Sequence, residues 1–132
     1  MESFSLQIVT PDGCVYDGKA EKVVCRTIRG DVAVLARHCD YCTAIGMGSA
    51  HVTADGNTRF AACMGGMLSV MDGRVRLVAT TWEWADQIDR ARAEASKARA
   101  EAVLAQKDAD KRELELAKAR LDRALVRASV AQ

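Results

Sequence analysis

The positions of glycine and proline divide this chain into two parts that must fold differently. All nine glycines and the single proline lie at or before Gly73, whereas residues 82–132 contain no glycine, proline or cysteine and have fourteen alanines. Glycine and proline mark turns between short strands, and a long alanine-rich stretch without either is typical of helix. The sequence therefore predicts a β-domain over residues 1–81 and a helical domain over residues 82–132.

The first part carries the signals of short strands joined by tight turns. Phe4, Leu6 and Ile8 alternate with polar residues, which is the period of a half-buried strand. The Thr-Pro-Asp-Gly segment at 10–13 predicts a turn, and Asp-Gly pairs between β-prone runs predict two hairpins, at 55–56 and 72–73. This succession predicts a β-sandwich or flattened barrel.

The second part has a helical period. One seam of mainly small apolar residues advances in steps of three and four, through Ile88, Ala91, Ala95, Ala98, Ala102 and Ala105. Polar residues 106–110 interrupt it, and a second seam with the same steps follows, through Leu114, Ala117, Leu121, Ala124 and Ala128. We expect an antiparallel two-helix hairpin. Because a buried alanine contributes little apolar area, we expect the hairpin to be weakly held and able to change partners, the alternative being an inert helical cap.

Charge and hydropathy exclude several classes of protein. The 19 Lys and Arg residues nearly balance the 18 Asp and Glu residues, which argues against nucleic-acid binding and against a polybasic membrane anchor. No apolar run approaches the roughly 18 residues of a membrane span, and the N-terminus lacks the pattern of a signal peptide. We expect a soluble chain that is not exported and is at most peripheral to a membrane.

The five cysteines raise the question of metal or thiol chemistry. Cys39 and Cys42 form a C-x-x-C pair next to His38. Zinc needs a second pair of ligands, and a thioredoxin-like site needs a βαβ context, and neither is present. We therefore expect free thiols that serve as small packing residues, and no metal. The alternative is a stand-alone metal- or redox-sensing module using these three residues. No pattern of catalytic residues is present, so an enzyme is not expected.

The order of several segments resembles the epsilon subunit of bacterial F-type ATP synthases over essentially the whole chain. The segments are "LQIVTPDGCVYDGKAEKVV", "GDVAVLARH", "MGGMLSV" and "VRLVATTWEWADQIDRARAEA". The most specific parts are the turn at 10–13, the stretch 30–38, the Gly65-Gly66 pair and the Ile88-Asp89 opening of the helical part. The resemblance implies a non-catalytic subunit of a rotary machine.

The resemblance also implies partners and a location. In such a machine the β-sandwich contacts the gamma subunit and the membrane ring of c subunits. The subunit is then a peripheral protein on the cytoplasmic side of the bacterial cell membrane. The helical hairpin either folds down or extends toward the catalytic alpha/beta head and inhibits ATP hydrolysis. Asp31 and His38 are the candidates for the rotor-ring contact, the plain alternative for His38 being a hydrogen-bonded loop histidine. Cations of the second helix are candidates for the head: Lys111, Arg112, Lys118 and Arg120.

The segment "IDRARA" at 88–93 matches the nucleotide-binding motif I-D-x-x-R-A of that family, through Ile88, Asp89, Arg92 and Ala93. Asp89, Arg92 and Arg99 share a helical face, and two further arginines form an i,i+4 pair, Arg123 and Arg127. Guanidinium groups bind phosphate bidentately, and a carboxylate accepts from an amino or hydroxyl group. We expect no required cofactor, and ATP as a regulatory ligand. The alternative is an ordinary surface ion pair between Asp89 and Arg92.

Overall fold

The computed structural model describes residues 2–131 and divides the chain into two compact units after Trp84. The predicted boundary lay before Trp82. The structure places it three residues later because Trp82–Trp84 form a strand that pairs with the sheet of the first unit. Composition could not reveal this, since a short strand without glycine or proline looks like the beginning of the helical part.

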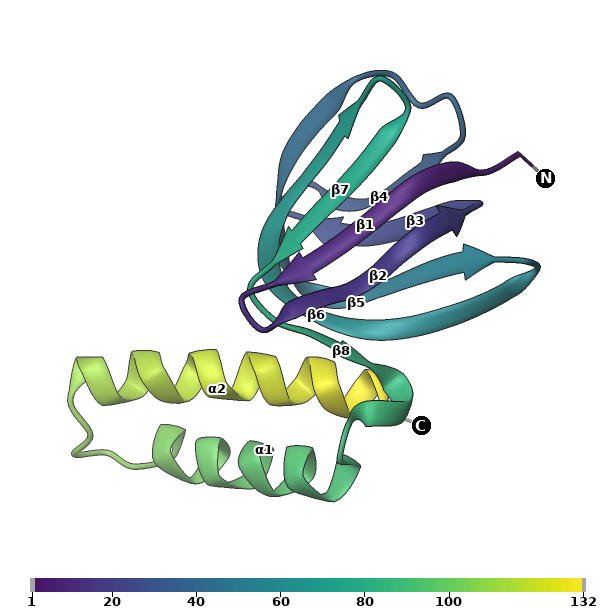
Figure 1. Cartoon of the computed structure of the whole chain (residues 1–132). Coiled ribbons are helices and arrows are strands. Elements are labelled where there is room, and N and C mark those ends of the chain that lie inside the picture. The colour runs from purple at the N-terminus through teal and green to yellow at the C-terminus, as the bar shows by residue number, and fades with distance from the viewer. Residues whose placement is uncertain (1, 132) are drawn as a thin grey trace. The chain divides into compact units, whose positions relative to one another are not determined.

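The first unit is a single eight-stranded sheet folded into a β-sandwich, as the sequence predicted (Figure 1). Its strands are β1 (Phe4–Thr10), β2 (Gly13–Ala20), β3 (Lys22–Thr27), β4 (Gly30–Leu35), β5 (Tyr41–Ala54), β6 (Asn57–Met71), β7 (Arg74–Ala79) and β8 (Trp82–Trp84). Their order is β2-β1-β7-β6-β5-β3-β4, with β8 on β6. Among the strand pairs within residues 2–131, only β1 and β7 are parallel, and the others are antiparallel.

The long strand β6 changes partner at a pair of glycines. Ala61–Cys63 pair with β8, whereas Gly66–Met71 pair with β7. Gly65 lies between these two pairings and Gly66 begins the second, with φ angles of 109° and 142°, which side chains rarely allow. A Cβ atom on Gly66 would lie 2.0 Å from the carbonyl oxygen of Val78. Glycine at 66 is therefore required for β7 to approach β6.

The predicted turns are confirmed and have clear local causes. The hydroxyl of Thr10 accepts from the backbone N–H of Asp12 at 3.2 Å and donates to the carbonyl of Gly13 at 3.3 Å. At the two hairpins, both residues of each Asp-Gly pair have positive φ: Asp55 (51°) and Gly56 (77°), and Asp72 (50°) and Gly73 (76°). Positive φ at both central residues defines the type I′ turn, whose twist suits antiparallel strands.

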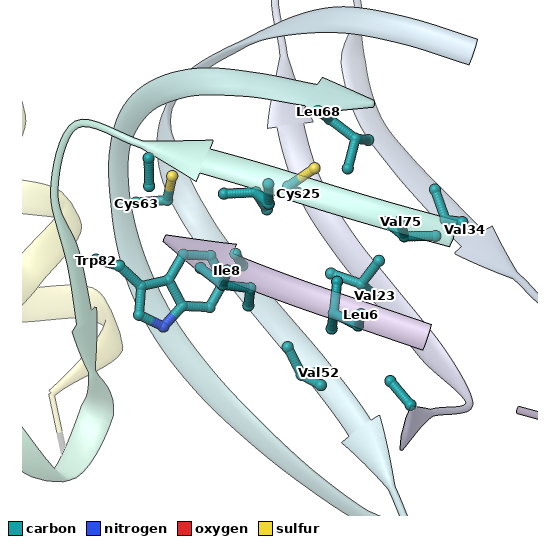
Figure 2. Packing of buried hydrophobic residues seen from close by; sticks show 14 of the residues in the cluster. Leu6, Ile8, Val23, Cys25, Val34, Val52, Cys63, Leu68, Val75 and Trp82 are labelled. Carbon is teal, nitrogen blue, oxygen red and sulfur yellow. The ribbon is translucent and has the colours of Figure 1, made fainter. Parts of the chain in front are cut away.

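The core of the sandwich is formed by inward-facing aliphatic side chains of both layers (Figure 2). Leu6, Ile8, Leu68 and Leu77 are at most 1% exposed, and burial of each such side chain stabilises the fold by roughly 2 kcal/mol. The predicted alternation in β1 is confirmed, because Phe4, Leu6 and Ile8 are all buried.

The second unit is a pair of packed helices, α1 (Arg90–Leu104) and α2 (Lys111–Val130), preceded by the short 3₁₀ helix η1 (Ala85–Gln87). Each α-helix begins at an aspartate N-cap. The carboxylate of Asp89 accepts from the backbone N–H of Arg92 at 3.1 Å, and that of Asp110 accepts from the N–H of Glu113 at 2.8 Å. The predicted helical hairpin and its polar break are confirmed.

The buried face of α1 differs from the predicted seam. Ala91, Ala95, Ala98 and Ala102 are exposed, and Ala93 and Ala100 are buried instead, each 4% exposed. Half-buried Val103 and Leu104 share the buried side. In α2 the prediction holds, because Ala117 and Ala124 are buried and Leu114, Leu121 and Ala128 are half-buried.

Candidate functional site

A groove of about 470 Å³ runs between α1 and α2, and half of its lining residues are arginines. The lining residues comprise four arginines, one serine and three small aliphatic residues: Arg99, Arg120, Arg123, Arg127, Ser96, Ala100, Val103 and Ala117. All of them belong to the helical unit. The groove is therefore a concave site with small apolar residues among cationic ones.

Helical spacing positions the arginines. Arg120, Arg123 and Arg127 advance along α2 in steps of three and four, which places them on one face of that helix. Arg99 lies on α1, three residues after Ser96, and faces the same groove. Alanine at positions 100 and 117 lets the two helices pack closely. The groove therefore receives guanidinium groups from both of its walls.

The groove concentrates positive charge that the protein itself leaves largely unneutralised. Guanidinium groups stay charged at any physiological pH. Within residues 2–131, no side-chain hydrogen bond or ion pair involves Arg99, Arg120 or Arg123, and no lining residue is acidic. Guanidinium donors in this number suit a ligand with many anionic oxygens.

Three of the residues predicted to bind ATP meet in this groove: Arg99, Arg123 and Arg127. The groove also contains Arg120, which was predicted to be a candidate contact with the catalytic head. The signal that identifies Arg120 is its spacing, since it precedes Arg123 by three residues and Arg127 by seven.

The four residues of the motif itself do not line the groove. Ile88 and Ala93 are buried, and Arg92 is exposed one turn before Ser96 on α1. Asp89 caps α1 through the backbone N–H of Arg92, so the pair is joined by a cap and not by the surface ion pair considered as an alternative. In this structure the motif forms the beginning of α1.

The two candidates for a rotor-ring contact lie at opposite ends of β4. Asp31 is the second residue of the strand and forms an ion pair with Arg26, whose Nε lies 2.9 Å from Oδ1. His38 follows the other end, after a turn at residues 36–37 in which its backbone N–H donates to the carbonyl of Leu35 at 3.3 Å. The two residues do not share one loop, because Asp31 belongs to the strand Gly30–Leu35 and His38 follows it.

The loop around His38 is held by local contacts. The Nδ1 atom of His38 lies 2.7 Å from the carbonyl oxygen of Cys39, and its ring packs edge-on against Tyr41 at 5.8 Å. The carboxylate of Asp40 accepts from the backbone N–H of Asp72 at 3.1 Å. His38 is thus a hydrogen-bonded, half-buried loop histidine in this structure.

The two cysteines of the C-x-x-C pair do not occupy the positions predicted for them. All five are free, but Cys39 and Cys42 are exposed, so the prediction that they pack in the core is wrong. The inward residue of this part of β5 is Ile45, and Cys42 falls on the outward side with Ala44. The buried cysteines are Cys25 and Cys63, and burial raises the pKa of Cys25 to about 12 (Figure 2). Across residues 2–131, no three His, Cys, Asp or Glu side chains gather as metal ligands.

Comparison with known proteins supports the resemblance over the full length. Residues 3–85 match the model of the ATP synthase delta/epsilon chain β-sandwich domain, and residues 86–132 match the long α-helix domain. The chain is 38% identical to the ATP synthase epsilon chain of Ruminococcus albus, covering 99% of this chain and 98% of that one. The same figures describe the epsilon chain of Bacillus velezensis.

Solved structures show the same fold. A chain of the Euglena gracilis mitochondrial ATP synthase superposes with a TM-score of 0.82 at 20% identity, covering 91% of this chain and 76% of that chain. A chain from the central stalk and c-ring of the Tetrahymena thermophila mitochondrial ATP synthase gives 0.66 at 12% identity, covering 99% and 98%. None of the helices in residues 2–131 is long and apolar enough to cross a bilayer.

A β-sandwich followed by an arginine-bearing helical hairpin is the architecture of an accessory subunit of a larger assembly. The two matching family models identify that assembly as an ATP synthase. The chain belongs to the ATP synthase delta/epsilon chain family. Its full-length bacterial relatives are epsilon chains, which confirms the resemblance read from the sequence.

Proposed function

We propose that this chain is the non-catalytic epsilon subunit of the central stalk, or rotor, of a bacterial F-type ATP synthase. In this role it couples the membrane rotor ring to the catalytic head, peripheral to the cytoplasmic side of the membrane. The observation that carries the proposal is the match to both domains of the family, from residue 3 to residue 132. The central-stalk origin of the Tetrahymena chain with the same fold supports it.

In this proposal the sandwich contacts the gamma subunit and the ring of c subunits. Several large apolar side chains on its surface are available for such contacts. Ile28 is 88% exposed in the turn between β3 and β4, three residues before Asp31, and Met71 is 61% exposed at the β6–β7 hairpin. Exposed apolar residues of this size are typical of protein interfaces.

The helical hairpin is the proposed regulator of ATP hydrolysis. Extended toward the alpha/beta head it inhibits the enzyme, and ATP bound in the arginine-lined groove stabilises the closed pair of helices. A ligand shifts such an equilibrium only by binding the two states unequally. ATP would bind the closed state more tightly than the extended one, because the walls of the groove come from two different helices and exist together only when α1 and α2 are packed.

Truncation of the assembled enzyme tests the regulatory role. The chain should end after Trp84, and not before Trp82, because β8 belongs to the sandwich. We expect the complex with the truncated subunit to hydrolyse ATP faster than the complex with the full chain, with gamma still co-purifying. Unchanged hydrolysis in an intact complex would contradict the inhibitory role. Loss of gamma from both complexes would contradict the stalk assignment.

A further inference from the structure

The short strand β8 determines where the helical unit is attached to the sandwich. Within residues 2–131, Trp82–Trp84 pair only with Ala61–Cys63 of β6. The next residue, Ala85, is the first residue of the helical unit. A strand of three residues that pairs on one side forms few backbone hydrogen bonds. The side chains of β8 therefore contribute much of what keeps this strand in place.

Trp84, the last residue of the strand, is held by contacts on its ring. It is 4% exposed, and the ring of Trp82 meets it edge-on at 5.3 Å. The guanidinium carbon of Arg59, on β6, lies 3.9 Å from the centre of the Trp84 ring. Cation–π contacts act within about 6 Å and are strongest on tryptophan. Tyr16 of β2 adds a tilted aromatic contact at 6.5 Å, so Trp84 joins β8 to both β6 and β2.

Arg59 is free to stack on this ring and is presented from a well-fixed backbone. Within the described residues, no ion pair joins Arg59 to a carboxylate. Arg59 pairs with Val52 across the β5–β6 hairpin, three residues after Gly56. The backbone N–H of Gly56 donates to the Glu21 carboxylate at 3.2 Å, and the N–H of Glu21 donates to the carbonyl of Thr53 at 2.7 Å. The hairpin that carries Arg59 is therefore tied to the segment before β3.

We propose that Arg59 is a positioning residue that holds β8 on the sandwich through Trp84 and so fixes the residue at which the helical unit begins to move. The inference rests on the proposed regulatory movement of the hairpin and adds the residue that controls its reach. Release of β8 adds three residues to the connection to α1, each extending it by about 3.3 Å. A connection longer than its span requires lowers the effective concentration of the hairpin at a site on the head. Loss of Arg59 should therefore weaken the inhibition of ATP hydrolysis.

Hydrogen exchange of the full chain, followed by mass spectrometry, tests the contact. The exchange rate of amides that open locally reports the equilibrium constant of that opening. Arg59→Ala should speed exchange in the peptide that contains β8 by about tenfold, which is within the strength of a cation–π contact. Exchange in β1 and β7 should stay unchanged. Arg59→Lys, which keeps a positive charge, should give a rate between those of Arg59→Ala and the unchanged chain.

Arg74→Ala is the matched control for the exchange experiment. Arg74 is an exposed arginine of β7, and Arg59 is the one arginine of the described chain that stacks on a ring. Arg74→Ala removes the same positive charge from the sandwich and should leave exchange in β8 unchanged. Equal effects of the two variants on β8 would mean that net charge, and not the contact with Trp84, sets the rate, and would overturn the inference.

Hydrolysis by the assembled enzyme tests the consequence. We expect the complex with Arg59→Ala to hydrolyse ATP at least about twofold faster than the complex with the unchanged chain. Its rate should not exceed that of the complex whose subunit ends after Trp84, because truncation removes the hairpin altogether. Arg59→Lys should again give an intermediate rate.

The possible failures are distinguishable. Unchanged exchange in β8 would overturn the inference, and so would faster exchange throughout the sandwich, because Arg59 would then stabilise the whole fold. If exchange in β8 is faster and hydrolysis is unchanged while truncation raises it, control of the hairpin by Arg59 is wrong and the inhibitory role stands. If truncation also leaves hydrolysis unchanged, the inhibitory role and the inference are both wrong.

Discussion

Replacing Ala93 by leucine tests which face of α1 holds the helical unit together. Ala93 is 4% exposed, whereas Ala95, two residues further on, is exposed and belonged to the seam predicted from the sequence. Leucine adds three carbon atoms and has nearly the same helix propensity as alanine, so propensity changes stability little at either site. The two variants therefore differ mainly in the space available to the new side chain.

The expected magnitude follows from burial. At Ala93 the added carbons enter closely packed space, and overpacking of this kind costs about 1–3 kcal/mol, which is roughly a 5- to 150-fold change in the equilibrium for closing the helices. At Ala95 the same atoms extend into solvent, and the change should stay within about 0.5 kcal/mol.

Urea titration of the full chain provides the measurement. Ellipticity at 222 nm reports the helices, and tryptophan fluorescence reports the sandwich, since both tryptophans lie in β8. We expect Ala93→Leu to lower the midpoint of the helical transition and Ala95→Leu to leave it unchanged. The reverse result, with Ala95→Leu destabilising and Ala93→Leu neutral, would refute the assignment of the buried face.

Three further predictions concern the sandwich. Gly66→Ala should destabilise the sandwich by at least about 3 kcal/mol in thermal melting, because a Cβ atom there would lie 2.0 Å from the Val78 carbonyl oxygen. Gly46→Ala, where a Cβ atom has no neighbour within 4 Å, should cost under about 1 kcal/mol. Similar costs for the two variants would contradict the close approach of β7. Ellman's reagent should modify three thiols in the native chain and five after denaturation, the reactive three being Cys14, Cys39 and Cys42. Burial raises the pKa of Cys25 from 9.0 to about 12, so the neutral thiol contributes to the stability of the fold below pH 9. This contribution to stability is lost as the pH rises toward 12. Cys25→Ala should reduce that loss of stability at high pH.

The sandwich was largely predictable because its signals are local. The alternation of Phe4, Leu6 and Ile8 specifies an inward face without knowledge of the rest of the fold, and an Asp-Gly pair between two strands specifies a type I′ turn. The boundary was three residues off because β8 joins the sheet through its pairing with β6, which no local pattern reveals.

The spacing of apolar residues predicted the buried face of α2 correctly but not that of α1. In α2, Leu114 and Leu121 are larger than the alanines around them and mark the correct face. In α1, alanine occurs on two opposite faces, so the period of the alanines did not identify the buried one. The residues that mark it are Val103 and Leu104, near the end of the helix. Alanine gives little information about direction because it is tolerated both in water and in a core.

For the candidate site, the sequence identified three of the four arginines of the groove and missed Arg120. It also placed Asp89 among the ligands, where the structure gives that residue a capping role. Both differences have one cause. A motif indicates which residues share a helical face, but which cations converge between two helices depends on how the helices pack.

The position of the two tryptophans has a spectroscopic consequence. Trp82 and Trp84 lie in β8, their rings meet edge-on at 5.3 Å, and the guanidinium of Arg59 lies 3.9 Å from the centre of the Trp84 ring. Neither tryptophan lines the arginine groove. Their emission is therefore an intrinsic signal of the last strand of the sandwich. A nucleotide that alters this emission has changed the surroundings of that strand. A nucleotide that binds only between the helices should leave the tryptophan emission unchanged, so its binding has to be measured by calorimetry.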